Sequence, residues 1–364
     1  MSTTLLCLAG TDVLRVSDQF SPEFLQSLMA TVFSRLSNSD PTNSAVWTPP
    51  RISIPMPAHT ALFMPSRIAS DSTTGGTAVK IVSVPTSPTD ARGLPASTLV
   101  LDEETGAVKA IVNAANLTAL RNAAGSLLSC NLVGPHAPTN IVVFGAGAQI
   151  AAHLDIFLRA FPSFKHCTIV NRNLNERADK LAERVRTPFP SVNLNVYIDD
   201  AESTAENAAL RSAIIAAQVV ICATSSTIPL FPSSSISDGT HIILIGSYKP
   251  TMHEVDGALI ERALPSRLIV DSREACAAEA GEIIAANLKH DQLVEMGDLV
   301  QFDTSSGELY LDPARKPLEF VAGSTSGPVT IFKSVGVGIQ DVAIACAVVQ
   351  RAEEMGLGTN IPWD

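Results

Sequence analysis

The stretch Ile141–Asn173, IVVFGAGAQIAAHLDIFLRAFPSFKHCTIVNRN, decides how this chain folds. It opens with an uncharged run of β-branched and aromatic residues, which is typical of a strand buried on both faces. The turn Gly145-Ala146-Gly147 follows, and the apolar periodicity from Gln149 to Phe161 predicts a helix. A second strand is expected at Cys167–Val170. Strand, helix and strand in this order predict a βαβ unit of about 30 residues.

The turn after the first strand predicts a dinucleotide site. Glycines there let the backbone approach a pyrophosphate, and the amides at the helix N-terminus bind the anion. The G-x-G-x-x-G pattern is incomplete because Ile150 occupies its third position, so the helix must sit slightly differently against the strand. A glycine pair alone often marks a plain turn, and the flanking elements are what favour nucleotide binding. The expected contacts are Gly145, Ala146, Gly147, Ala148 and Gln149.

The end of the second strand indicates which dinucleotide binds. An NAD site places an Asp or Glu there, about 20 residues past the glycines, to hold the ribose 2′-hydroxyl. Here the strand runs into Asn171-Arg172-Asn173, and the first carboxylate is Glu176. A guanidinium and two amides suit a 2′-phosphate, so we expect NADP(H), with NAD(H) as the alternative. The competing interpretation is that Arg172 is only a solvated charge at a strand end.

Composition limits the class of protein. A chain of 364 residues, 46% hydrophobic and 17% charged, predicts two domains with large cores. The formal net charge of −11 argues against a nucleic-acid partner. No apolar run reaches the length of about 18 residues that spans a membrane, and the first residues lack the pattern of a signal peptide. Six scattered cysteines are typical of free thiols in a cytoplasmic protein, and the seven histidines show no spacing that predicts a metal site.

The region before the βαβ unit predicts a mixed sheet with flanking helices. Thr4–Val16 is interpreted as two short strands around a turn. Ser21-Pro22-Glu23 opens a helix, because serine caps the helix and proline suits its first position. Further elements are expected as strands at Arg51–Pro55, Thr60–Met64 and Thr77–Val84, a hairpin at Leu99–Asn113 and a helix at Thr118–Leu132. The pair Gly134-Pro135 then predicts a domain boundary.

Beyond Arg172, strands and helices alternate, which predicts a parallel, doubly wound sheet. The segment Gly323–Lys333 lies outside this alternation. Val335–Glu354 predicts a long helix that returns to the first domain. The expected strands are Val192–Tyr197, Val219–Ala223, His241–Ile245 and Leu268–Val270.

Ordered blocks over nearly the whole chain resemble the ornithine cyclodeaminase/μ-crystallin family. The resemblance implies an α/β fold, with a Rossmann-type doubly wound domain at residues 134–324. It also implies a mixed α/β substrate-binding and dimerisation domain formed by residues 1–133 with 325–364, and therefore a homodimer. The blocks are Arg51-Ile52-Ser53-Ile54-Pro55, Thr77-Ala78-Val79-Lys80, Leu117-Thr118-Ala119-Leu120-Arg121-Asn122, Gly145-Ala146-Gly147-Ala148-Gln149, Asp271-Ser272-Arg273-Glu274-Ala275 with Glu279-Ala280-Gly281-Glu282, and Thr330-Ile331-Phe332-Lys333 with Asp341.

The same resemblance implies that Arg51, Lys80 and Arg121 bind the carboxylate of the substrate. An arginine fork pairs two carboxylate oxygens at once and fixes the α-carbon over the nicotinamide. Lys80 lies in an apolar strand, so burial should lower its pKa and permit proton transfer as well. Taken singly, each of the three could be an ordinary surface charge. We predict catalytic roles for Lys80 and Arg121.

Two further positions bear on the reaction. Glu279 matches a glutamate of the μ-crystallin branch and is the other candidate proton donor to an imine nitrogen, unless it is only an acid on a helix face. Tyr248 stands where ornithine cyclodeaminases carry an aspartate that grips the distal amine. A phenol is not a base near neutral pH, so this position favours a reductase. Met56 completes the expected substrate contacts, and Thr224 and Lys333 complete the cofactor contacts.

The favoured interpretation is an NADPH-dependent reductase of a carboxylate-bearing ketimine or cyclic imine. Hydride would go to the imine carbon and give a cyclic or N-substituted amino acid. The alternatives are an ammonia-releasing ornithine cyclodeaminase, an amino-acid dehydrogenase like alanine dehydrogenase, and a non-enzymatic NADPH-binding protein in the manner of μ-crystallin. We expect a small carboxylate as partner, a cytoplasmic location, and no nucleic acid, membrane or metal.

Overall fold

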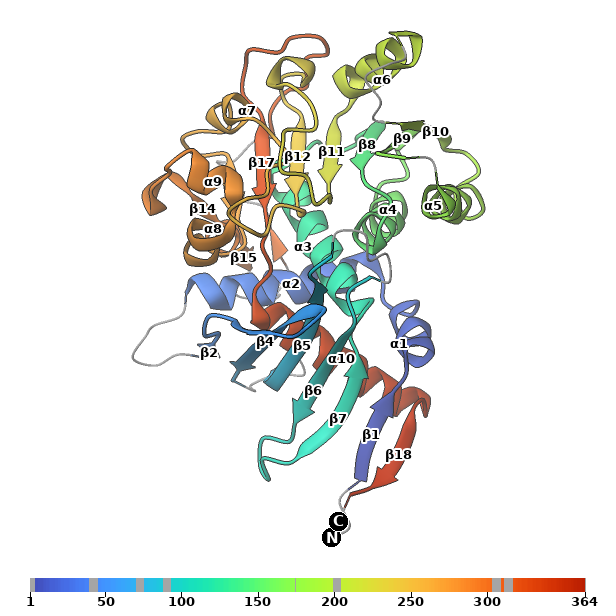
Figure 1. Cartoon of the computed structure of the whole chain (residues 1–364), viewed down its shortest axis with the longest axis vertical. Helices are drawn as coiled ribbons and strands as arrows, with labels where there is room; N and C mark the ends of the chain where they lie inside the picture. The colour runs from blue at the N-terminus through green and yellow to red at the C-terminus, as the bar shows by residue number, and fades with distance from the viewer. Residues whose placement is uncertain are drawn as a thin grey trace. The chain divides into compact units, whose positions relative to one another are not determined.

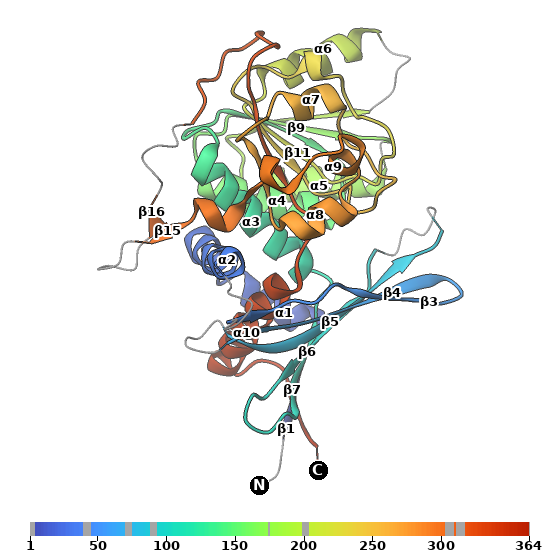
Figure 2. The same ribbon diagram turned by 90° about the vertical axis from the view of Figure 1, so that its left-hand side faces the viewer.

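The computed structural model describes residues 4–38, 45–69, 75–87, 93–173, 175–198, 204–302, 309–310 and 317–363, and Figures 1 and 2 draw its ribbon. The chain forms two compact units, residues 1–121 with 336–364 and residues 122–335. One contains a mixed sheet and the other a parallel sheet, so the predicted α/β fold class is confirmed. The units change inside helix α3, Leu117–Val133, and after strand β17, Thr330–Lys333, whereas the sequence predicted changes after residues 133 and 324.

The mixed sheet of the first unit has the strand order β18-β1-β7-β6-β5-β4-β2, with β3 paired to β4. Among the described residues of this sheet, β1 and β7 run parallel, and all other paired strands run antiparallel. The predicted hairpin is confirmed as β6 and β7. The strands are β1 Thr4–Leu8, β2 Val46–Trp47, β3 Ile52–Pro55, β4 His59–Ile68, β5 Gly76–Pro85, β6 Ala96–Leu101, β7 Val108–Asn113 and β18 Thr359–Pro362.

Helix α10, Gly338–Met355, covers one face of this sheet. Figure 1 shows it running behind β5, β6 and β7. Its residues are buried almost without interruption up to Val349. The predicted return of the last long helix to the first unit is therefore confirmed. Helix α2, Pro22–Ser37, packs against α10, and its predicted cap is confirmed because Ser21 Oγ accepts a hydrogen bond from Phe24 N at 3.2 Å.

The second strand expected within Thr4–Val16 is wrong, because these residues form helix α1, Gly10–Ser17. Asp12 caps its start, since the carboxylate accepts a hydrogen bond from Ala9 N at 3.0 Å. Val13 and Val16 are buried at helical spacing. Glycine at the first helical position hid this start, because glycine more often signals a turn.

The parallel sheet of the second unit has the strand order β10-β9-β8-β11-β12-β17-β13-β14. Its βαβ unit is confirmed as β8 Asn140–Phe144, α4 Ala148–Ala160 and β9 His166–Asn171. The strand order reverses beside β8, which is where open α/β sheets bind their ligands. The remaining strands are β10 Asn193–Ile198, β11 Val219–Cys222, β12 His241–Leu244, β13 Leu268–Val270, β14 Val294–Glu295 and β17 Thr330–Lys333, with β15 Gln301–Phe302 pairing β16 Leu309–Tyr310 outside this sheet.

Strand β17 corrects the expectation that Gly323–Lys333 lies outside the alternating pattern. It pairs in parallel with both β12 and β13, and all four of its residues are buried. A loop leads into this strand, so the alternation of strands and helices gave no signal for it. The second unit consequently extends to residue 335.

Helix α3, Leu117–Val133, is buried along most of its length, and within the second unit two histidines contact it. His153 Nε2 lies 2.9 Å from Ser126 Oγ, and His241 Nε2 lies 3.0 Å from Ser129 Oγ. Both histidines are 0% exposed.

Among the described residues, no helix has the length and apolarity to cross a membrane. The other helices are α5 Glu176–Arg186, α6 Thr204–Ala216, α7 Gly257–Glu261, α8 Arg273–Glu279 and α9 Gly281–Ala285, with short 3₁₀ helices at Ser233–Ser235, His290–Gln292 and Met296–Leu299.

Candidate functional site

Lys80 is buried in the middle of β5, on the side of the strand that α10 covers. Its side chain is 2% exposed, and Nζ lies 2.8 Å from Asp341 Oδ2. The pKa of Lys80 is lowered to about 8, chiefly by burial; the charges of Arg121 and Arg51 also lower it, and Asp341 acts in the opposite direction. The predicted burial and the lowered pKa are confirmed. The alternative of a lysine that reaches solvent is wrong.

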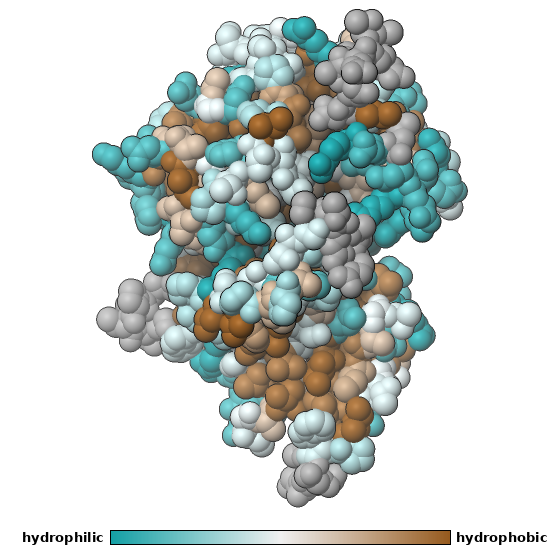
Figure 3. Space-filling model, in the orientation of Figure 1, coloured by the Kyte–Doolittle hydropathy of each residue, from teal (hydrophilic) through white to brown (hydrophobic). Residues whose placement is uncertain are grey.

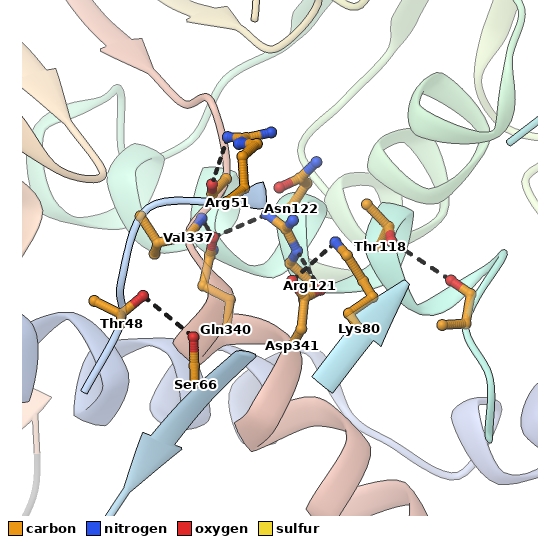
Figure 4. Close-up of polar contacts among 12 residues, drawn as sticks. Thr48, Arg51, Ser66, Lys80, Thr118, Arg121, Asn122, Val337, Gln340 and Asp341 are labelled. Atoms are coloured by element: carbon orange, nitrogen blue, oxygen red, sulfur yellow. Dashed lines mark hydrogen bonds and ion pairs between the residues drawn. The ribbon is translucent and has the colours of Figure 1, made fainter. Parts of the chain in front are cut away.

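Arg121 lies in the second turn of α3 and is 2% exposed. Its Nε donates a hydrogen bond to Asp341 Oδ1 at 3.2 Å, and its Nη1 donates to Gln340 Oε1 at 2.9 Å. Gln340 is held in turn, because its Oε1 also accepts a hydrogen bond from Val337 N at 3.1 Å. Figure 4 shows Arg121 and Lys80 pointing toward the same carboxylate. The alternative of a solvated helix position for Arg121 is wrong.

Arg51 directly precedes β3 and is half-buried. Its Nη2 donates a hydrogen bond to Gly336 O at 3.3 Å. Gly336 has φ +82°, a conformation that favours glycine, and it lies against the guanidinium of Arg121. The structure therefore brings the three predicted carboxylate-binding cations together within the first unit.

Asp341 is the member of this site to which sequence reasoning gave no role, although it stands in one of the blocks that resemble the family. Burial alone would raise the pKa of this carboxyl, but the charges of Arg121 and Lys80 outweigh burial and hold the pKa below its usual value. Apart from that resemblance, its signal in the sequence was an acid among the apolar residues of a long helix. We call Arg51, Lys80, Arg121 and Asp341 the cation cluster. It combines three cationic groups with one carboxylate, which suits the binding of an anion.

Met56 lies at the other end of β3, in the turn that leads to β4. Its N–H donates a hydrogen bond to His59 O at 2.7 Å, and the residue is 41% exposed. Its expected contact with the substrate stays a prediction.

The glycine turn after β8 has the geometry expected of a nucleotide-binding turn. Gly145 has φ +112°, its N–H donates to Val170 O at 2.8 Å, and a Cβ there would stand 3.0 Å from Ala223 O. Gly147 is the N-cap residue of α4 and makes no side-chain hydrogen bond there, and a Cβ on it would meet nothing within 4 Å. Gln149 Oε1 accepts a hydrogen bond from Asn122 Nδ2 at 3.2 Å. Ile150 is 0% exposed, so the unusual residue of the motif packs into the core.

The residues expected at the adenosine ribose lie at the carboxyl end of β9: Asn171 is its last residue, and Arg172 and Asn173 follow it. Asn171 Nδ2 donates a hydrogen bond to Asn173 O at 2.7 Å, which closes a short turn around Arg172. Arg172 and Asn173 are exposed. This position is compatible with a 2′-phosphate contact and equally with a solvated charge, so the choice between NADP(H) and NAD(H) stays a prediction.

Thr224, which follows β11, is held by a buried glutamate. Its N–H and Oγ1 donate to Glu254 Oε1 at 2.6 and 2.9 Å, and Gly246 N donates to Glu254 Oε2 at 2.7 Å. Glu254 is 0% exposed, and burial raises its pKa against the opposing charge of Lys333. The glutamate thus joins the backbone beyond β11 to the backbone beyond β12.

Lys333 ends β17 and is 1% exposed, so its side chain lies within the fold of the second unit. Its Nζ donates to Ser247 Oγ at 2.6 Å, and Ser247 Oγ donates to Glu282 Oε2 at 2.7 Å. Glu282 Oε1 accepts a hydrogen bond from Glu254 N at 2.7 Å. Sequence reasoning gave no role to Glu254, Glu282 or Ser247, because their partners lie far apart in the chain.

Glu279 and Tyr248 both belong to the second unit. Glu279 is the last residue of α8 and is half-buried. Tyr248 packs against the hydrophobic core of that unit, and Lys249 Nζ lies 5.6 Å from its ring centroid. Their contacts with a substrate stay predictions. Among the described residues, no group of three or more His, Cys, Asp or Glu side chains is arranged to hold a metal.

Fold and site together define a Rossmann-type α/β protein that carries a second, mixed-sheet unit with a buried cation cluster. The model of the ornithine cyclodeaminase/mu-crystallin family matches residues 11–356, and the chain belongs to this family. It is 31% identical over 271 residues to the iminosuccinate reductase of Paracoccus denitrificans, covering 72% of each chain. It is 28% identical over 250 residues to the ketimine reductase mu-crystallin of Mus musculus, covering 69% of this chain and 67% of that one.

A solved structure confirms the fold over nearly all of the chain. The Δ1-pyrroline-2-carboxylate reductase of Thermococcus litoralis, solved with NADH and L-proline, has a TM-score of 0.77 and 24% identity to this chain. The match covers 98% of this chain and 100% of the other.

Proposed function

We propose that this protein is an NADPH-dependent reductase of a ketimine or cyclic imine that bears a carboxylate on the imine carbon. Its coarse class, an NAD(P)H oxidoreductase acting on C=N bonds, is the class that its named relatives share. The observation that carries the proposal is the cation cluster, in which Arg51, Lys80 and Arg121 gather around Asp341. The product is a cyclic or N-substituted amino acid.

The cation cluster binds the carboxylate of the substrate. The guanidinium groups of Arg51 and Arg121 each present parallel N–H donors that match two carboxylate oxygens. Lys80 adds a charge from within the fold, where a low dielectric strengthens its attraction for an anion. Holding the carboxylate fixes the carbon next to it, and that carbon is the one that receives hydride.

Lys80 is also a candidate proton donor. An amine with a pKa near 8 is mostly protonated at neutral pH, and its lowered pKa makes it a better proton donor to an imine nitrogen. Transfer from Nζ to the nitrogen makes the imine carbon a better hydride acceptor. Glu279 is the second candidate for this role, because a carboxylic acid at the end of α8 can donate in the same way.

The glycine turn after β8 supports a nicotinamide dinucleotide as the hydride source. Gly147 and the first amides of α4 offer donors to a pyrophosphate, with open space in front of Gly147. Ala146 and Ala148 keep the turn small. We propose that Arg172, with Asn171 and Asn173, binds the 2′-phosphate of NADPH; the remaining proposed contacts are Thr224 and Lys333.

We further propose that the protein is a homodimer. The face of the mixed sheet opposite α10 carries half-buried apolar side chains, namely Phe63, Val79, Ile81, Leu99 and Ile111. They are neighbours across the strands, because Phe63 pairs with Ile81 and Leu99 pairs with both Val79 and Ile111. Figure 3 shows apolar side chains gathered over this part of the first unit. A second copy of the chain would remove this surface from water.

The decisive experiment measures oxidation of NADPH against a panel of substrates. The panel contains cyclic imine-2-carboxylates, iminosuccinate, and keto acids with ammonia or methylamine; ornithine with NAD⁺ is the contrasting assay. We expect turnover with at least one carboxylate-bearing imine and none with its decarboxylated analogue. Release of ammonia from ornithine would overturn the proposal in favour of a cyclodeaminase, and turnover only with free ammonia would favour an amino-acid dehydrogenase.

A matched pair of variants tests the role of the cation cluster. Arg51→Met should lower kcat/KM by about a hundredfold, because it removes a charged hydrogen-bond donor from the carboxylate. Arg67→Met is the control, since Arg67 lies on the adjacent β4 and pairs with Glu103 on the surface. Equal losses in both variants, or none in either, would contradict the assigned role.

A further inference from the structure

Asp341 contacts both buried cations of the site with different oxygens. Oδ1 accepts a hydrogen bond from Arg121 Nε at 3.2 Å, and Oδ2 lies 2.8 Å from Lys80 Nζ. All three side chains are at most 3% exposed. One carboxylate therefore joins β5 and α3 through α10 in a place that solvent hardly reaches.

We propose that Asp341 is a positioning residue of the reductase proposed above: it keeps Lys80 charged and aimed beside Arg121, so that the substrate's carboxylate meets a cation at neutral pH. The inference rests on the proposed function, because it explains how the carboxylate site stays ready to bind. Asp341 acts through Lys80 and Arg121 and needs no contact with the substrate.

The geometry holds the carboxylate in one orientation. Asp341 lies in the first turn of α10, where the helix dipole favours a negative charge. Its neighbour Gln340 accepts a hydrogen bond from Arg121 Nη1 at 2.9 Å, so the first turn of α10 grips the guanidinium at two points. Gly336 lets Arg121 lie close to the chain that leads into α10. The first turn of α10 therefore holds the guanidinium of Arg121 in place, and the contact with Arg121 in turn holds the carboxylate of Asp341.

The charges around Lys80 give this contact its effect. Arg121 from α3 and Arg51 from the segment before β3 both disfavour a charged lysine, and burial disfavours it most. The strand neighbours opposite Lys80 are Met64 and Thr98, which carry no charge. Asp341 is the group that favours the ammonium, through its charge and its hydrogen bond. Together these influences give Lys80 a pKa of about 8. Loss of the carboxylate would lower this pKa further, so Lys80 would be neutral at neutral pH.

The variant Asp341→Asn tests this role, because asparagine keeps the shape and removes the charge. Binding of L-proline to the NADPH-bound protein is measured by calorimetry across pH, since an amino-acid product with reduced cofactor cannot react. In the unchanged protein, affinity should stay level up to about pH 8 and then fall by up to about tenfold per pH unit, because one proton must be bound. In Asp341→Asn the fall should begin at least about one pH unit lower, and affinity should recover in acid.

The alternative, a purely structural aspartate, gives a different result. Loss by the same factor at every pH, or no loss at all, would overturn the proposal. Asp238→Asn is the matched control, because Asp238 also pairs with a largely buried arginine, with Oδ1 3.0 Å from Arg262 Nη2. That variant should leave the pH at which affinity falls unchanged. In Lys80→Arg with Asp341→Asn, binding should no longer depend on pH, because arginine stays charged.

A second measurement needs no ligand and separates this inference from the proposed function. The ¹³Cε signal of Lys80, assigned by its loss in Lys80→Arg, reports the protonation of the amine directly. Its titration should move to lower pH in Asp341→Asn and stay close to its original position in Asp341→Glu, which keeps the charge. An unchanged titration in Asp341→Asn overturns the inference, whereas a shifted titration in a protein that reduces no imine overturns only the proposed function. Circular dichroism and NADPH binding establish that each variant is folded.

Discussion

Gly336 lies directly against the guanidinium of Arg121. A Cβ on Gly336 would stand 2.7 Å from both Nη1 and Nη2 of that arginine, closer than side-chain atoms normally approach. The carbonyl oxygen of the same glycine accepts a hydrogen bond from Arg51 Nη2 at 3.3 Å. A residue without a side chain therefore spaces the two arginines of the cation cluster.

Replacement of this glycine should disturb the site more than the fold. In Gly336→Ala the methyl group displaces Arg121, so KM for the imine should rise about tenfold or more, and the positive φ should cost about 1–2 kcal/mol of unfolding free energy. Steady-state kinetics and urea unfolding measure the two effects. Gly106→Ala is the control, since Gly106 has φ +73° with nothing within 4 Å of a Cβ. It should lose similar stability with KM unchanged; a parallel rise in its KM would refute the spacing role.

Cofactor preference should depend on Arg172. The change Arg172→Asp places a carboxylate where an NAD site has one, so it should repel a 2′-phosphate and accept a ribose hydroxyl. The ratio of kcat/KM for NADPH over NADH should fall by at least about tenfold. Arg186→Asp, at the exposed end of α5, is the control for the change in charge. A ratio that stays the same in Arg172→Asp would mean that Arg172 is only a solvated strand-end charge.

Glu254 should hold the two turns beyond β11 and β12 in place. Its carboxylate accepts hydrogen bonds from Thr224 N, Thr224 Oγ1 and Gly246 N. Glu254→Gln puts an amide donor against one of these donors, which should cost about 1–3 kcal/mol of unfolding free energy. The Kd for the cofactor should also rise, because the first of these turns follows β11, the strand next to β8. Glu319→Gln, a change of the same kind at a loop residue, should alter neither; an unchanged Kd in Glu254→Gln would remove the glutamate from the cofactor site.

Acid should unfold the protein through its two buried histidines. Burial lowers the pKa of His153 to about 4 and that of His241 to about 3. In the unfolded chain a histidine has a pKa of about 6.5, so stability is fully present above that value and is lost as pH falls toward the folded values. Between about pH 6 and 4 each histidine should remove roughly 1.4 kcal/mol per pH unit.

Urea unfolding at a series of pH values measures this slope. His241→Asn should be less stable at neutral pH but should lose roughly half of the steepness in acid. His166→Asn, at an exposed position of β9, should retain the full slope. An equal slope in all three proteins would show that other groups govern the acid transition.

The apolar face of the mixed sheet should govern assembly. Light scattering should give twice the mass of the chain, and Ile81→Lys, a charge placed in the middle of that face, should give a monomer. Ser83→Lys, near the end of the same strand, should weaken the dimer less. A monomeric unchanged protein would contradict the proposed homodimer.

Local patterns were sufficient for most elements of the fold. The βαβ unit, the capped helix at Ser21 and the hairpin of β6 and β7 each depend on neighbours a few residues apart, so periodicity and turn residues predicted them. The segment around Val13 is a helix that Asp12 caps. The sequence did not predict it, because Gly10 at its start suggests a turn. Periodicity did not predict strand β17, because its place between β12 and β13 depends on partners far away in the chain.

The sequence by itself determined that a Gly-x-Gly turn follows a buried strand, that Lys80 lies in an apolar strand, and which family the blocks resemble. Tertiary structure alone decided that Asp341 joins Lys80 to Arg121, a residue 220 positions earlier in the chain. It also decided that Glu254 joins the turns beyond β11 and β12. The physical reason is that periodicity reports whether a side chain is buried, whereas the partner of a buried charge depends on which helix packs over which strand.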